Sequence, residues 1–160
     1  MTRHLIALIS SINLAFGSAA YADVEFQEKG DDFSNEIVSS LRVGTTDTSP
    51  AVLILSCNPA TGLNVQLATE DVMYPDEARK DQMNISTTHK FQEAPEAATT
   101  YWAMKIAKYK SSWYQGDPRA FIEESAESSQ LNMRLNRTGT VYRFSLEGTA
   151  EHLRKILRRC

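Results

Sequence analysis

Residues that could carry acid–base chemistry are few in this chain and widely spaced. Beyond its first few residues the chain has two histidines, His89 and His152. Neither lies in a pattern such as Gly-x-Ser-x-Gly, which would place a nucleophile and a base together. His89 falls at the end of an alternating stretch, and His152 lies among cationic residues close to the C-terminus. We expect both histidines on the surface, and we expect no Ser–His catalysis.

Adjacent carboxylates are the other candidates for catalysis, and they occur at Asp31-Asp32, Glu70-Asp71, Asp76-Glu77 and Glu123-Glu124. Acid–base work needs two carboxylates in one cleft with separated pKa values. Neighbouring residues point to opposite faces of a strand and diverge by about 100° on a helix. These pairs are therefore predicted to be solvated surface. Asp76, Glu77 and Asp81 could bind calcium weakly, but their spacing is not that of an EF-hand loop. We predict no catalytic residue, no metal site and no cofactor.

The first 22 residues predict export from the cytoplasm. Arg3 and His4 precede the apolar run LIALISSINLAF, and Ala20-Tyr21-Ala22 has the small-x-small spacing of a signal peptidase site. An apolar run of about a dozen residues is too short to span a bilayer comfortably. We expect cleavage after Ala22 and a periplasmic mature chain of residues 23–160. That length suits a single domain, and we expect no transmembrane span in it.

The predicted compartment bears on the state of the two cysteines, Cys57 and Cys160. In an exported chain two cysteines favour one disulfide. Closing a loop of about a hundred residues would stabilise the fold by roughly 4–5 kcal/mol. A free terminal thiol, or a bridge between two chains, is the alternative.

Net charge limits the class of partner. The formal net charge is -3 at pH 7. Because neutralising phosphates requires a basic surface, this balance argues against general nucleic-acid binding.

Hydrophobic periodicity predicts a chain made mostly of strands. Strands are predicted at residues 34–43, 51–57, 63–69, 83–91, 101–110, 131–135 and 141–145. Asp117-Pro118 predicts the start of a helix, and apolar spacing after Gly148-Thr149 predicts a second helix that runs to the end. Residues 23–33 are predicted to be a loose lead-in, and 70–82 an exposed loop or short helical turn. The run 51–57 is predicted to be covered on both faces. The fold class is therefore predicted to be α+β, a mostly antiparallel β-sheet with two helices packed on it and one disulfide.

Two groups of residues could form a binding surface. The first is aromatic, consisting of Tyr101, Trp102, Trp113 and Tyr114. Such rings either pack in a core or line a groove that stacks on sugars or anchors a protein partner. The second is cationic, consisting of Arg154, Lys155, Arg158 and Arg159. These cations either complement the dipole of the last helix or bind an anionic partner.

The C-terminal part of the chain resembles small periplasmic proteins of the VasI type, which are associated with type VI secretion. The likeness rests on Ala120-Phe121 before a strand with Arg134, on Phe144-Ser145-Leu146-Glu147-Gly148, and on a last helix that ends at Cys160. Cys57 matches the upstream cysteine of that family, and the resemblance covers roughly residues 51–160. Invasion-associated locus B proteins look similar at the C-terminal end.

These features together predict an exported accessory protein without catalytic activity. It is expected to bind another component of the cell envelope or secretion system, either an envelope protein or a cell-wall component. The alternative is a periplasmic carbohydrate-binding or enzyme-inhibitor module that uses exposed aromatic residues.

Overall fold

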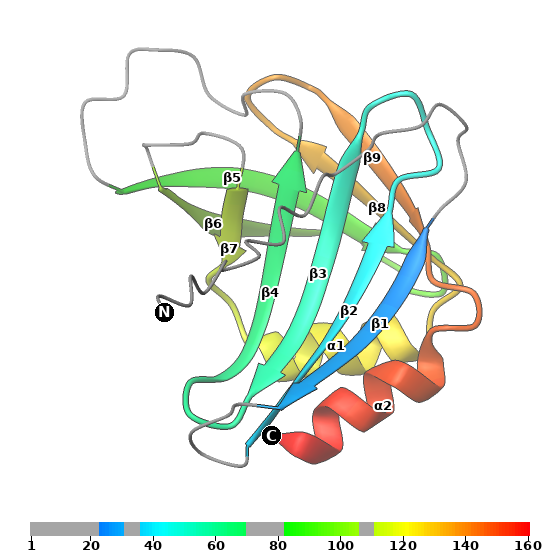
Figure 1. Ribbon diagram of the computed structural model, residues 1–160. Helices are drawn as coiled ribbons and strands as arrows, with labels where there is room; N and C mark the ends of the chain where they lie inside the picture. Colours follow the sequence, from blue (N-terminus) through cyan, green and yellow to red (C-terminus); the bar gives the residue numbers. More distant parts are fainter. Residues whose placement is uncertain (1–22, 31–35, 70–81, 106–110) are drawn as a thin grey trace, which may run out of the picture.

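The computed structural model describes residues 23–30, 36–69, 82–105 and 111–160 (Figure 1). Within these residues the strands are β1 (Val24–Gly30), β2 (Ile37–Gly44), β3 (Ala51–Asn58), β4 (Gly62–Thr69), β5 (Gln82–Phe91), β6 (Ala98–Lys105), β7 (Ser111–Tyr114), β8 (Gln130–Leu135) and β9 (Val141–Ser145). The helices are α1 (Pro118–Ala126) and α2 (Ala150–Arg159).

All these strands belong to one sheet, in the order β1-β2-β3-β4-β7-β6-β5-β8-β9. Every neighbouring pair in it is antiparallel. With two helices and one disulfide, this architecture confirms the predicted fold class.

The sheet curls until its far strand meets the end of β2. Thr45 forms a bridge with Phe144 of β9, and the Thr46 amide donates to the Arg143 carbonyl at 2.9 Å. Arg143 also forms an ion pair with Asp47 at 3.3 Å. Because β9 meets the chain just beyond β2, β1 remains outside the closure as an edge strand.

Side chains alternate between an inner face, which carries the core, and an outer face. Fully buried inner residues include Leu41, Leu53, Leu55, Leu67, Trp102, Met104, Leu131, Met133 and Phe144. Both helices pack on the inner face: Phe121 of α1 contacts the Trp102 ring, and Leu153 and Ile156 of α2 are fully buried. Figure 1 shows the two helices on one side of the sheet, next to β1–β4.

Both predicted helix starts are confirmed, and each has a local cause. The Asp117 carboxylate accepts from the amides of Arg119 at 2.9 Å and Ala120 at 3.3 Å, and Pro118 occupies the first turn. Before α2, Gly148 has φ 76°, a backbone conformation that favours glycine.

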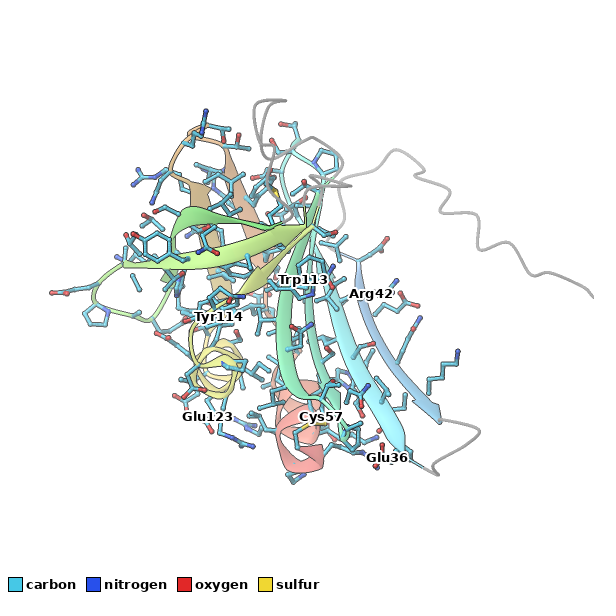
Figure 2. The ribbon with its side chains drawn as sticks, turned by 90° about the vertical axis from the view of Figure 1, so that its left-hand side faces the viewer. Glu36, Arg42, Cys57, Trp113, Tyr114 and Glu123 are labelled. Atoms are coloured by element: carbon cyan, nitrogen blue, oxygen red, sulfur yellow. A yellow bond between two sulfur atoms is a disulfide. The ribbon has the colours of Figure 1, made fainter. Side chains whose placement is uncertain are left out.

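The predicted disulfide is present. It joins Cys57, at the end of β3, to Cys160, directly after α2, with a Cα–Cα distance of 5.9 Å. Cys57 is fully buried, whereas Cys160 is exposed. The link ties the C-terminal helix to the end of β3 (Figure 2).

The N-terminal prediction was wrong, because residues 24–30 are a strand rather than a loose lead-in. The cause lies in α2: the Phe26 ring stacks on His152 with centroids 4.5 Å apart, and Glu28 accepts from Lys155 at 2.6 Å and Arg159 at 2.9 Å. These contacts hold a polar segment as a strand along β2.

Two further predictions differ from the structure. In β3 only alternate residues are buried, so the prediction that 51–57 is covered on both faces was wrong. The sequence pattern predicts no strand at Ser111–Tyr114, yet β7 pairs there with β4 on one side and β6 on the other. Residues 70–81 and 106–110, parts of a predicted loop and a predicted strand, lie outside the described residues.

Candidate functional site

The four predicted aromatic residues divide between the two faces of the sheet. Trp102 is fully buried and Tyr114 packs against the core, whereas the Tyr101 side chain is 62% exposed and Trp113 is half-buried on the outer face. Consecutive residues of a strand point to opposite faces, which explains the division. Figure 2 labels both β7 residues, with Tyr114 lying toward α1. The four rings therefore do not line one groove.

The inner pair belongs to an aromatic cluster that also contains His89, Phe91 and Phe121. Phe121 is its centre, with ring centroids 5.0 Å from Tyr114 and 5.2 Å from Phe91. Burial is the main cause that raises the pKa of the Tyr114 hydroxyl, and the charges of Asp117 and Glu124 add to it. For Trp102 and Tyr114 the core interpretation is confirmed.

His89 also belongs to this cluster, so its predicted place on the surface was wrong. Only 5% of the residue is exposed, and its ring centroid lies 5.3 Å from that of Phe121. Its Nδ1 is 3.4 Å from the Thr100 hydroxyl, which also accepts from the Trp102 indole at 3.3 Å. Burial lowers the pKa of His89 because the charged form is poorly solvated. A neutral imidazole among aromatic rings acts as a structural polar group.

The outer face of β5 and β6 presents a different arrangement, centred on Tyr101. In the strand register Tyr101 lies opposite Ser86, and Thr99 lies opposite Thr88. Trp113 lies opposite Ala103, two residues along β6 from Tyr101. Tyr101 and Trp113 are therefore diagonal neighbours on one face, at a separation that large side chains can bridge.

A hydrogen-bonded network lies beside the Tyr101 ring. Thr88 Oγ1 donates to Asn136 Oδ1 at 2.9 Å, and Asn136 Nδ2 donates to Ser86 Oγ at 2.8 Å. Thr88 and Thr99 hydroxyls are 3.0 Å apart. Since Thr88 has already donated its one proton, Thr99 must donate to it. We call these four residues, together with Tyr101 and Trp113, the outer-face patch.

The outward residues around the outer-face patch are mostly uncharged. The outward residues around it are Asn64, Gln66 and Ala68 on β4, Ser111 on β7, Ala103 on β6 and Asn84 on β5. The exposed cations Arg134, opposite Thr88 on β8, and Lys90, two residues along β5 from Thr88, lie at its border. Uncharged donors and acceptors beside an exposed ring can bind a polar, uncharged ligand through its edge and its face.

The basic residues of α2 also divide into two sets. Lys155 and Arg159 bind Glu28 of β1, and the Lys155 ammonium lies 5.3 Å from the centroid of the Phe26 ring. The hydrogen bond from Lys155 is the largest cause that lowers the pKa of Glu28. Arg154 and Arg158 are exposed. Because two of the four cations bind within the chain, the predicted anion-binding surface is reduced to Arg154 and Arg158.

The remaining catalytic and metal candidates do not come together in the described part of the chain. Glu123 and Glu124 are exposed on α1, with Glu123 3.9 Å from Arg119, while His152 stacks on Phe26. The other three carboxylate pairs, and the possible calcium ligands Asp76, Glu77 and Asp81, lie outside the described residues. Among residues 23–30, 36–69, 82–105 and 111–160 there is no group of three His, Cys, Asp or Glu residues that could hold a metal ion. No helix in these ranges is long and apolar enough to cross a membrane.

Four members of the outer-face patch were not predicted as site residues: Ser86, Thr88, Thr99 and Asn136. The alternation of Asn84, Ser86 and Thr88 was a signal that they share one face. Nothing in the sequence indicates that Asn136, which follows β8, reaches back to β5.

Comparison of the chain with protein-family models, with curated proteins and with solved structures returns no match. The class supported by the described residues is thus an antiparallel α+β fold with one disulfide. The resemblance to VasI-type proteins remains a prediction.

Proposed function

We propose that this chain is an exported accessory protein of the bacterial cell envelope, and that it acts by binding another envelope component through the outer-face patch. The observation that carries the proposal is Tyr101, 62% exposed on the outer face of the sheet, where its neighbours in the register on β5 and β6 are small or polar. An exposed aromatic ring on a rigid, uncharged surface is typical of a recognition site.

Two features support the exported location. The link between Cys57 and Cys160 belongs to the class of structural disulfides that persist in oxidising compartments such as the periplasm. The first strand begins at Val24, directly after the predicted cleavage at Ala22. The resemblance to VasI-type proteins makes a component of type VI secretion the first partner to test.

The test places a photo-crosslinking amino acid at one position of the full-length chain in a bacterial host. Position 101 reports on the outer-face patch, and position 119, exposed on α1, is the matched control. We expect a specific crosslinked species from position 101 in the periplasmic fraction and none from position 119. Equal crosslinking from both positions, or retention of the protein in the cytoplasm, would contradict the proposal.

A further inference from the structure

We propose that the outer-face patch binds an uncharged pyranose glycan. The inference rests on the proposed function, since it names the class of ligand taken by the same surface. A pyranose ring has an apolar face of C–H groups and an edge of hydroxyls. It therefore needs an aromatic face beside a set of mixed donors and acceptors.

The aromatic part of the site is held by a rigid backbone. Tyr101 lies in β6 between β5 and the end of β7, opposite Ser86, and its carbonyl accepts from the Gln115 amide at 3.1 Å. Trp113 is its diagonal neighbour. Rings carried by the interior of a sheet lose little conformational freedom on binding, which favours affinity.

The polar part of the site is ordered but not saturated. The network runs from Thr99 to Thr88, on to Asn136 and then to Ser86. After these bonds, Ser86 keeps a hydroxyl proton, Thr99 keeps its acceptor lone pairs, and Asn136 keeps its second N–H and a lone pair. This residual set both donates and accepts, as sugar hydroxyls do. The bonds within the network fix which of these groups donates a hydrogen bond and which accepts one.

Charge selects an uncharged ligand over an anionic one. The outward residues that neighbour Tyr101 in the register, on β5 and β6, are Asn84, Ser86, Thr88, Thr99 and Ala103, all uncharged. The cations lie at the border of the patch: Arg134 is opposite Thr88, Lys90 is two residues along β5 from Thr88, and Lys105 ends β6. An anionic polymer would meet these cations only at the border of the patch and on three different strands, whereas phosphate or carboxylate recognition depends on several cations that converge on one group. The exposed cations Arg154 and Arg158 lie on α2, which packs on the inner face.

The experiment titrates the purified full-length mature protein with chito-oligosaccharides, which are uncharged, and with an oligogalacturonate of similar length, which is anionic. Tryptophan fluorescence and calorimetry report binding. We expect the chito-oligosaccharide to bind and to change the fluorescence, and Trp113→Phe to abolish the fluorescence change. Tyr101→Ala should weaken binding at least tenfold, and Tyr101→Phe should weaken it less than threefold.

Two variants make the test specific to the site. Asn136→Ala removes the centre of the network and should weaken binding at least fivefold. Gln27→Ala, on the exposed edge strand β1, should leave binding unchanged. Because Tyr101 is exposed, its variants are expected to melt as the parent does, and thermal unfolding checks this.

Three results overturn the inference: no binding of the uncharged glycan, equal binding by Tyr101→Ala, or salt-sensitive binding of the anionic glycan alone. If position 101 crosslinks an envelope protein while glycans do not bind, the glycan inference fails and the proposed function stands. If the glycan binds with unchanged affinity in Tyr101→Ala, the glycan inference fails at this site.

Discussion

Replacing Cys160 with serine is expected to lower the free energy of unfolding by several kcal/mol. The disulfide joins residues 103 positions apart, and the chain-entropy model gives about 4.7 kcal/mol for a loop of that length. Cys160 is exposed and Cys57 is fully buried. The Cys160 variant therefore isolates the loss of the crosslink, whereas removing the Cys57 side chain would also open a cavity in the core.

Urea denaturation of oxidised protein and of Cys160→Ser measures this difference. For a small protein the urea slope is about 1–3 kcal/mol per molar, so the midpoint should fall by roughly 2 to 5 M. Because domains have only about 5–15 kcal/mol of stability, the variant is expected to be close to unfolding at 37 °C. The parent protein under a reducing agent is the matched control, and it should unfold at the same urea concentration as the variant.

The reasoning would be refuted by a loss of less than about 1 kcal/mol, since the chain-entropy model predicts several times more. It would also be refuted if both Cys57 and Cys160 in the exported protein react with an alkylating agent under denaturing, non-reducing conditions.

Three further predictions follow from the described contacts. The free energy of unfolding should fall as the pH drops below about 6.5, because burial lowers the pKa of His89 in the folded state and the unfolded chain takes up the proton first. Urea titrations at pH 7.5 and pH 5 measure this fall, and His89→Gln should make it smaller. Asp117→Ala should cost about 1 kcal/mol, measured the same way, and Asp117→Asn should recover most of the loss by restoring the cap of α1. Gly116→Ala should lower the free energy of unfolding by about 1–3 kcal/mol and alter the near-ultraviolet circular dichroism, because a Cβ at position 116 would collide with the Tyr114 ring. In the control variant Gly30→Ala the new Cβ meets open space, so neither the stability nor the spectrum should change.

The elements that the sequence predicts well are those with a local cause. Asp117 followed by Pro118 begins α1 because the cap and the fixed proline φ act within one turn. The alternation of Leu63, Val65 and Leu67 marks β4, because one face of that strand lies against the core. β1 was not predicted because its residues are mostly polar and exposed, and the side chains that hold it lie on α2, where Lys155 is 127 positions from Glu28.

The candidate site was predictable only in part for the same reason. Alternation separates Tyr101 from Trp102, but no local pattern tells which of the two faces the core. That choice depends on where α1 packs, since Phe121 covers the face that carries Trp102. The surface position predicted for His89 failed because the same packing encloses its imidazole.

The sequence by itself determined most of the strands, the two helices, the fold class and the pair of cysteines, because periodicity, caps and composition act through neighbouring residues. Only the tertiary structure decided that β1 is a strand, that His89 is buried, and that Asn136 reaches back to Ser86 and Thr88 beside an exposed Tyr101. Strand order and register bring together residues separated by about fifty positions, and no local preference encodes such pairings.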